Sequence, residues 1–463
     1  MADLNTAPVT DDNGLEGLYG LTDALIRDVQ GAVESGDADA VGWLVGSLHP
    51  ADVADLIECL PSAQRDKLES LLGGDLDPQV FAYLDTSLRD DLIDDLDPSQ
   101  LAEVAAGLES DDAVELIEML DAGDQRAVLD SMSAGDRVMV EQALGYPADS
   151  AGRLMRREYV AIPAFWTVGE TIDHMRSDAD LPDTFYGIFA VGPDHKPLGV
   201  IMTNRLLRAQ RSVLVTDILA ESFKQIPAAM DQEDVAFLFR QYDLAEAAVV
   251  DVSGRLVGVI TVDDVVDVIQ EEHDEDILKL GGVATDDLYE AVAATTRSRL
   301  SWLLVNLATA VVASLVIGLF QAQIERVVAL AVLMPIVASM GGNAGTQTLT
   351  VAVRALAVRE LTAQNALYII GKEVVVGGVN GMIFAVLTGT IAYLWFGDML
   401  IGLVIGLAMI INMFVAGLAG ILVPIGLDRA NIDPAVASSV ILTTITDVVG
   451  FFCFLGLAAL VLL

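Results

Sequence analysis

Asp447 is the only charged residue in the apolar stretch Pro434–Leu463, and it lies near the middle of that stretch. An acid at the centre of a bilayer costs about 2.5–3.5 kcal/mol on insertion scales, so it is rarely there without a function. Two explanations need no function. Asp447 could lie near a helix end, with its side chain reaching the membrane surface, or its helix could be buried in the core of a soluble protein. The short Asp side chain lies many residues from either end, which argues against the first. We therefore predict a cation or proton site at Asp447.

A second group of candidate residues lies in PIVASMGGNAGTQTLT, which begins at Pro335. Proline and glycine weaken a helix and free backbone carbonyls, while small residues allow close helix approach. Asn343, Thr346 and Gln347 add neutral polar groups at the same level. Mg²⁺ keeps several of its waters, so a wide oxygen-lined site with one carboxylate suits it. On chemistry alone Na⁺ and H⁺ stay open as alternatives. Close helix packing is the alternative explanation of the glycines, but Pro, three Gly, Asn and Gln within thirteen residues are more than packing requires.

Five apolar segments pass the test of about 20 residues for a membrane-spanning helix. They are Leu300–Ile324, Val327–Val353, Val374–Gly397, Met399–Leu427 and Pro434–Leu463. Arginine or lysine residues precede the first segment and separate the second from the third and the fourth from the fifth. By the positive-inside rule the large N-terminal region is cytoplasmic and the C-terminus lies outside. The N-terminus lacks the basic region and apolar core of a secretory signal.

The chain of 463 residues combines a net charge of −42 with 53% hydrophobic residues. Most of the acid precedes the first apolar segment, and the remainder is almost continuously apolar. Phosphate binding needs a surplus of Lys and Arg, so this charge excludes nucleic acid as a partner. An acidic soluble region joined to a membrane domain fits cations better.

The soluble part contains two patterns. In the first, apolar residues recur at three- and four-residue spacing between turn signals such as Asp-Pro, which predicts an all-helical, superhelical domain. The second alternates strands and helices, and FYGIFAVGPDHKPLGVIM and AEAAVVDVSGRLVGVITVDDVVDVIQ share one layout. Each has an apolar strand, a Gly/Asp turn, a strand ending Gly-Val-Ile and a helix. This duplication resembles a tandem pair of CBS modules, which commonly sense nucleotides or ions.

The motifs GGNAGTQ and NIDPAVASSVILTTITDVVG, with the CBS-like pair and the helical acidic region, resemble the MgtE family of magnesium transporters and channels. The similarity covers residues 20–463 in the family's domain order. It implies a multi-domain protein with an all-α cytoplasmic N domain, α/β CBS domains and an all-α membrane domain. The expected division is a disordered N-terminus (1–19), helical domain (20–148), CBS domains (149–210 and 211–270), plug helix and linker (271–296) and five-helix transmembrane domain (297–463).

The resemblance also implies a homodimer in the lipid bilayer, whose ion pathway on the two-fold axis is lined by the second and fifth spans. Asp447 matches the family's selectivity carboxylate, and the backbone of Thr443 matches a position close to that ion. Asp433 matches a carboxylate that helps to hold a second, gating-related ion. The pore-lining candidates on the second span are Gly341, Gly342, Asn343, Gly345 and Gln347.

Family members also bind regulatory Mg²⁺ between the N domain, the CBS pair and the plug helix, which locks the pore closed. The matching acids here are Asp264, Asp267, Glu272, Glu275, Asp276, Glu233 and Asp243, with Asp55 and Asp149 matching less closely. Acids at this density repel one another, and a bridging divalent ion reverses that cost. For any single acid, a solvated acidic face is the alternative.

Relatives that bind ATP in the CBS pair carry an Arg-Asp pair after the second strand of the first module. Asn204 and Arg205 stand there in this chain. The missing carboxylate for the ribose hydroxyls argues against ATP as a ligand. There is no Walker loop and no nucleophile–base arrangement, so we expect neither an enzyme nor an ATP-driven pump.

The predicted function is Mg²⁺-selective, channel-like uptake across the cytoplasmic membrane, closed by cytosolic Mg²⁺. The membrane potential favours entry by about 2.3 kcal/mol per charge per 100 mV. One alternative is a Mg²⁺ or Co²⁺ exchanger coupled to Na⁺ or H⁺, in which Asp447 changes protonation or occupancy in each cycle. Another is a membrane receptor whose spans anchor a CBS sensor, although an anchor needs no acid at mid-membrane.

Overall fold

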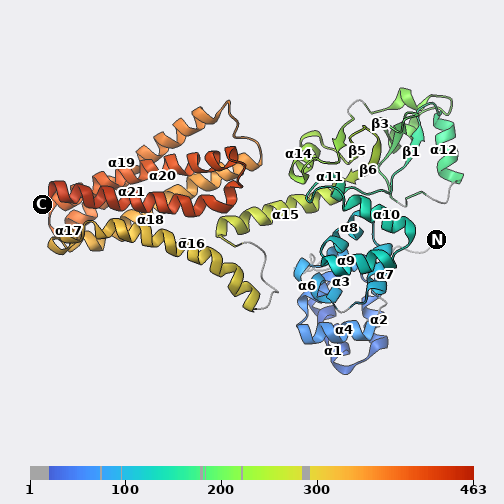
Figure 1. Cartoon of the computed structure of the whole chain (residues 1–463), viewed down its shortest axis with the longest axis horizontal. Helices are drawn as coiled ribbons and strands as arrows, with labels where there is room; N and C mark the ends of the chain where they lie inside the picture. Colours follow the sequence, from blue (N-terminus) through green and yellow to red (C-terminus); the bar gives the residue numbers. More distant parts are fainter. Residues whose placement is uncertain are drawn as a thin grey trace, which may run out of the picture. The chain divides into compact units, whose positions relative to one another are not determined.

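A computed structural model describes residues 20–72, 76–94, 96–177, 181–182, 184–220, 223–283 and 292–462. The chain divides into two compact units, Met1–Ile269 and Gln270–Leu463. The predicted disordered segment 1–19 lies outside the described residues, as do residues 284–291 of the predicted linker. Figure 1 gives the order of the elements along the chain.

The first unit begins with the predicted helical domain. Its helices are α1 (Asp23–Ser35), α2 (Ala38–Val45), α3 (Pro50–Cys59), α4 (Ser62–Leu72), α5 (Val80–Tyr83), α6 (Thr86–Asp94), α7 (Pro98–Gly107), α8 (Ser110–Glu118), α9 (Ala122–Ser131) and α10 (Ala134–Ala143). The Asp-Pro signal marks a helix start as predicted, because the carboxylate of Asp97 accepts from the backbone N–H groups of Ser99 and Gln100. Two clusters of buried apolar side chains form the cores of this domain.

Two three-stranded sheets follow, each continuing into a helix. The elements are α11 (Ala151–Leu154), β1 (Ala161–Pro163), α12 (Val168–Ser177), β2 (Gly187–Val191), β3 (Pro197–Met202), α13 (Thr203–Arg208), η1 (Val215–Ile218), β4 (Gln225–Pro227), α14 (Gln232–Tyr242), β5 (Glu246–Val250), β6 (Leu256–Thr261) and α15 (Val262–Gly281). In each sheet the first strand pairs in parallel with the second, which pairs antiparallel with the third. Both antiparallel pairs shift register near the end of the middle strand. This identical layout confirms the duplication predicted from sequence.

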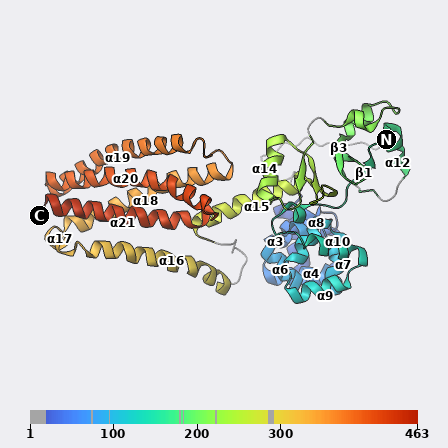
Figure 2. The ribbon, with the colours of Figure 1, turned by 45° about the horizontal axis from the view of Figure 1, so that its top comes forward.

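The second unit consists mainly of long apolar helices. They are α16 (Val292–Gly318), the short α17 (Gln321–Arg326), α18 (Ala329–Ala357), α19 (Ala366–Phe396), α20 (Met399–Arg429) and α21 (Pro434–Val461). Among the described residues, five helices are long and apolar enough to span a membrane. Helix α20 is the most buried of these five helices, and it packs between α19 and α21 (Figures 1 and 2).

Three sequence expectations about these helices were wrong. The first span does not continue to Ile324, because α16 ends at Gly318 and the chain turns before α17. The third span starts at Ala366 rather than Val374, so it includes Glu373. Pro335 and the glycines do not interrupt α18, which is continuous from Ala329 to Ala357. Apolarity alone does not locate these ends, and one proline removes only a single backbone donor.

Candidate cation sites

Asp447 lies well inside α21, the last apolar helix. Asp433 caps the start of that helix, because its carboxylate accepts from the backbone N–H of Ala435 at 2.8 Å. At 1.5 Å per residue, Asp447 is about 20 Å along the axis from Pro434. Its side chain is partly exposed, and it makes no hydrogen bond or ion pair with any group in the described residues. Asp447 is thus a carboxylate at membrane depth to which the described part of the chain supplies no counter-charge.

Thr443, the residue predicted close to the same ion, is exposed one turn before Asp447. Its hydroxyl donates to the carbonyl of Ser439 at 2.9 Å. Its own carbonyl accepts from the hydroxyl of Thr446 at 3.1 Å. Within α21 the same carbonyl also accepts from the backbone N–H of Asp447, so both of its lone pairs are used.

The glycine-rich motif of α18 has two faces. A Cβ on Gly345 would lie 2.9 Å from a Leu442 methyl of α21, and one on Gly341 would lie 2.2 Å from Asn412 Nδ2 of α20. These two glycines therefore allow close helix packing. Gly342 has no neighbouring atom within 4 Å of such a Cβ, and the Asn343 and Gln347 side chains are exposed on the chain.

Asn412, which the sequence did not single out, joins three of these helices. It is fully buried in α20, and its Nδ2 donates to the carbonyl of Val337 in α18 at 2.8 Å. A Cβ on Gly450 of α21 would also meet Asn412, at 2.9 Å. Gly450 lies one turn after Asp447, so Asn412 fixes α18 and α21 together near the level of that carboxylate.

In the first unit, Arg156 is the centre of an acidic cluster. It lies in an extended segment whose N–H donates to the carbonyl of Val259 in β6, and this pairing needs Gly258, where a Cβ would lie 2.7 Å from the Arg156 carbonyl. The guanidinium contacts Glu109 at 2.5 Å, Asp111 at 3.1 Å, Asp263 at 3.2 Å and, more closely still, Asp264. Burial alone would lower the pKa of Arg156. The negative charges of Asp111 and Asp264 have the larger effect, so the pKa of Arg156 is raised.

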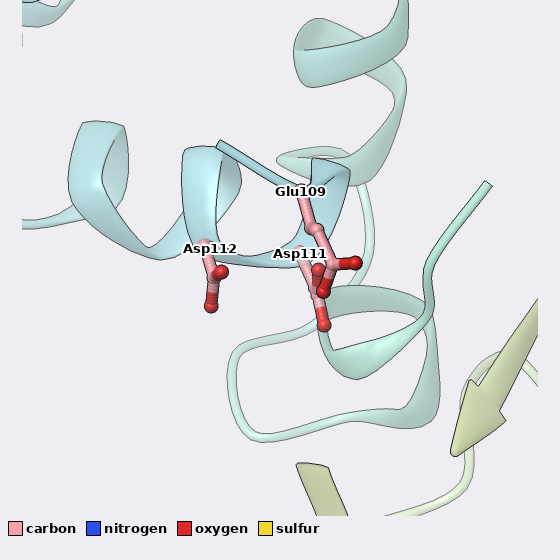
Figure 3. Close-up of side chains that lie close together, drawn as sticks. All are labelled: Glu109, Asp111 and Asp112. Carbon is pink, nitrogen blue, oxygen red and sulfur yellow. The ribbon is translucent and has the colours of Figure 1, made fainter. Parts of the chain in front are cut away.

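Three of the surrounding acids lie at the start of α8, as Figure 3 shows. A carboxylate oxygen from each of Glu109, Asp111 and Asp112 lies within 4.8 Å of the other two. Asp111 is 8% exposed, and its Oδ1 has no hydrogen-bond partner among the described residues. Burial, followed by the charge of Asp264, raises the pKa of Asp111. Burial, followed by the charge of Glu115, raises that of Asp112 to about 7. The cluster therefore carries more negative charge than Arg156 balances.

The structure brings only some of the predicted regulatory acids to this cluster. Asp264 is in it, in the first turn of α15, and its Oδ2 accepts from the N–H and hydroxyl of Thr261, the last residue of β6. Asp267 is one turn further along α15, and burial followed by the charge of Asp264 raises its pKa. The remaining first-unit candidates are exposed residues on other elements: Glu233 in the first turn of α14, Asp243 at its C-cap, Asp149 before α11 and Asp55 in α3.

A second acidic group lies in the membrane unit, where α15 ends beside the start of α21. Lys279 Nζ contacts Glu275 at 2.5 Å and Asp433 at 2.8 Å. Burial alone would lower the pKa of Lys279, but the hydrogen bonds to Asp433 and Glu275 raise it. Burial, followed by the charge of Asp433, raises the pKa of Asp276. Three predicted acids thus meet here around one lysine, and Glu272 lies one turn before Asp276 on α15.

Sequence reasoning missed Glu109, Asp111, Asp112, Arg156 and Lys279. Asp111 and Asp112 follow Ser110 in the first turn of α8, and acids in a first helical turn are a usual signal of a helix start. A basic residue among acids, as in the segment around Lys279, could have been noted as their partner. Arg156 offered no such signal, because its partners Asp111 and Asp264 are 45 and 108 residues away in the chain.

Three family models match this chain. One described as a divalent cation transporter matches residues 334–457, the MgtE intracellular N domain matches 48–149, and the CBS domain matches 215–271. The magnesium transporter MgtE of Thermus thermophilus is 32% identical over 448 residues, which cover 96% of this chain and 99% of the relative. This chain belongs to the MgtE family. The Bacillus subtilis magnesium transporter MgtE is 29% identical, with 95% of each chain covered.

Membership of the MgtE family makes the chain a magnesium transporter and a multi-pass membrane protein with a cytoplasmic N domain. The CBS family model covers only the second module, so the first is recognised by its matching sheet. A solved structure titled as the cytosolic domain of the Mg²⁺ channel MgtE in complex with ATP is 31% identical. It covers 52% of this chain and 99% of its own, with a TM-score of 0.48.

Proposed function

We propose that this MgtE-family protein is a Mg²⁺-selective, channel-like transporter that mediates uptake down the membrane potential. The observation that carries the proposal is the Asp447 carboxylate, which lies at membrane depth with no protein counter-charge in the described residues. A buried ion without a partner is costly, and a passing cation supplies the missing charge. The protein acts in the cytoplasmic membrane as a homodimer, with its C-terminus outside and Asp447 from each copy facing one pathway.

Several features favour Mg²⁺ as the transported ion. Mg²⁺ gives up its waters reluctantly and is usually held by one or two carboxylates. A pair of Asp447 side chains across a dimer axis offers that number. Asn343 and Gln347 are exposed on one chain and can bind the outer waters of a hydrated ion. The exposed Thr443 hydroxyl, one turn before Asp447, offers a further oxygen to these waters, because it donates to Ser439 and its own lone pairs are not used by that bond.

Cytosolic Mg²⁺ closes the pathway in this proposal by binding the acidic groups around Asp264 and Asp433. Both groups hold more carboxylates than basic side chains. Divalent ions reduce the repulsion that remains. Glu272, Glu275 and Asp276 on α15 connect this response to the membrane domain through the Asp433 cap of α21.

ATP is not required in the proposed mechanism. Arg205 stands where the carboxylate of the Arg-Asp pair would be needed, and its guanidinium donates to the carbonyl of Leu219 at 2.7 Å. We infer that Mg²⁺ alone is the regulatory ligand of this chain.

The decisive experiment measures Mg²⁺ flux into proteoliposomes across a range of cytoplasmic-side Mg²⁺. Asp447→Asn and Asp447→Ala should abolish uptake, whereas Asp398→Asn should not, because asparagine can still cap α20 as Asp398 does. Full uptake by both Asp447 variants would favour a receptor over a transporter pore. Uptake that stops when the proton and sodium gradients are collapsed would favour the coupled Mg²⁺ or Co²⁺ exchanger.

A further inference from the structure

A cavity of about 200 Å³ lies between α18, α19 and α20 of the membrane domain. It is lined by Ala344, Gln347, Thr348 and Val351 of α18, Glu373, Val376, Gly377 and Asn380 of α19, and Met413 and Gly417 of α20. The lining residues of α18 and of α19 each follow the spacing i, i+3, i+4 and i+7, so one face of each helix forms a wall. The cavity is thus bounded by one continuous face of α18 and one of α19, with α20 closing the third side.

Glycines bring α19 close to α20 and thereby form the floor of the cavity. A Cβ on Gly377 would lie 2.9 Å from the carbonyl of Met413, and one on Gly417 would lie 3.1 Å from the carbonyl of Glu373. No side chain larger than hydrogen fits at either position without moving a backbone. The glycines keep the Glu373 side chain at the wall of the cavity.

Glu373 is the charged residue of this cavity. Its side chain is only 14% exposed. It accepts a hydrogen bond from the hydroxyl of Thr348 at 3.3 Å, and its nearest cation is the Lys372 ammonium at 3.7 Å. Lys372 is 61% exposed, so solvent weakens the attraction of its ammonium for the Glu373 carboxylate. The buried carboxylate therefore lacks an adequate counter-charge within the described residues.

The other polar groups of the cavity are oxygen donors to a cation. The amides of Gln347 and Asn380 make no side-chain hydrogen bond within the described residues, which leaves their oxygens available. One water needs about 10–15 Å³ of such a cavity, so the cavity has room for a cation that keeps several of its waters. One carboxylate with neutral oxygens and retained waters is the environment that Mg²⁺ prefers.

We propose that the Glu373 cavity is a second binding site for a hydrated divalent cation in the membrane domain. This proposal rests on the proposed transport function. Glu373 is about 10 Å along α19 from its start, and Asp447 is about 20 Å along α21, whose start lies on the same side. The site is therefore nearer the cytoplasm than Asp447, and Gln347 belongs both to the cavity and to the predicted pore-lining face of α18. It holds an ion that has passed Asp447 before release to the cytoplasm.

Mn²⁺, which gives anomalous X-ray scattering, is the probe for crystals of the full-length protein. Wild type and Glu360→Gln, a change at an exposed glutamate after α18, should show an anomalous peak in the cavity. Glu373→Gln should lose that peak, with affinity lowered about tenfold or more, the value of a hydrogen bond to a charged group. Excess Mg²⁺ should displace Mn²⁺ from the cavity, and excess Na⁺ should not.

A cavity without a peak in wild type, a peak that persists in Glu373→Gln, or displacement by Na⁺ would each overturn the proposal. Asn380→Leu keeps the carboxylate but fills the cavity, and it should also lose the peak if Glu373→Gln does not fold. Asp447→Asn should retain the cavity peak while losing uptake. If Asp447→Asn retained uptake, the proposed function would fail while the peak still reported on the cavity alone.

Discussion

The acids of the cytoplasmic region and those at membrane depth differ in what balances their charge. The guanidinium of Arg156 contacts four carboxylates, and the ammonium of Lys279 contacts two. Asp447 contacts no basic group in the described residues, and Glu373 has only the exposed Lys372 nearby. The proposed sensing groups therefore contain a basic side chain of the protein, whereas the proposed transport groups rely on a mobile cation.

The difference has a physical consequence for ion binding. In the cytoplasmic clusters a basic side chain already lies between the carboxylates and neutralises part of their charge. Mg²⁺ must therefore compete with this side chain for the carboxylates. Such competition lowers affinity for Mg²⁺ while keeping the acids together when Mg²⁺ is scarce. A transport site needs the opposite, since a tethered cation next to Asp447 would repel each arriving ion.

The largest effect is expected when a basic side chain is placed next to Asp447. Thr443→Lys places an ammonium four residues before Asp447 on the same face of α21. Mg²⁺ uptake should fall about 100-fold, equivalent to the 2.5–3.5 kcal/mol of a charge at membrane depth. Flux into proteoliposomes measures the effect, and Thr443→Met controls for side-chain length. Equal losses in the two variants would contradict an electrostatic role for Asp447.

The reverse experiment removes the tethered cation from the cytoplasmic cluster. Arg156→Gln should destabilise the first unit by about 3–5 kcal/mol without Mg²⁺, the range found when one partner of a buried ion pair is lost. Mg²⁺ should recover much of this loss because the carboxylates are then free to bind it. Thermal unfolding of the full-length protein with EDTA and with Mg²⁺ measures both changes. Arg157→Gln is the control, since the Arg157 guanidinium donates to Gln142 and, among the described residues, makes no ion pair with the acids of the cluster.

The sequence predicted well those features that depend on local pattern. The two strand–turn–strand–helix segments and the apolar helices were found because alternation, turn residues and segment length are visible within about 20 residues. Asp447 was found because an acid in an apolar run is conspicuous. Arg156 was missed because its partners come from α8 and α15, and no local pattern joins residues so far apart. Glu373 was missed because the predicted third span began one residue after it.

Lys279→Met should change the sensing group near the membrane to a smaller degree. Without the ammonium, Glu275 and Asp433 are free for Mg²⁺, so the Mg²⁺ concentration that half-closes the pathway should fall by about three- to tenfold, corresponding to 0.6–1.4 kcal/mol. Flux measured against cytoplasmic-side Mg²⁺ gives this value. Lys196→Met, which removes an exposed lysine paired with Asp194, should leave the value unchanged. A higher half-closing concentration would show that Lys279 supports the closed state rather than competing with Mg²⁺.

The smallest expected effect is a pH dependence confined to the cytoplasmic cluster. Burial and the neighbouring charges of Glu115, Glu109 and Asp264 raise the pKa of Asp112 to about 7, against the opposing charge of Arg156. An acid whose folded-state pKa is raised favours the folded state below its unfolded pKa of about 4, and this stability is lost as the pH rises toward 7. The unfolding temperature of the first unit in EDTA should therefore fall between pH 5 and pH 8.

Asp112→Asn should remove part of this fall, and Mg²⁺ should also reduce it, because a bound cation stabilises the ionised carboxylates. Asp130→Asn, at an exposed acid that pairs with Arg137, serves as the control and should leave the pH dependence intact. A rise in unfolding temperature over the same interval would mean that Arg156 outweighs burial in the cluster. In that case the cytoplasmic acids would be fully balanced by the protein itself, and Mg²⁺ sensing would have to lie elsewhere.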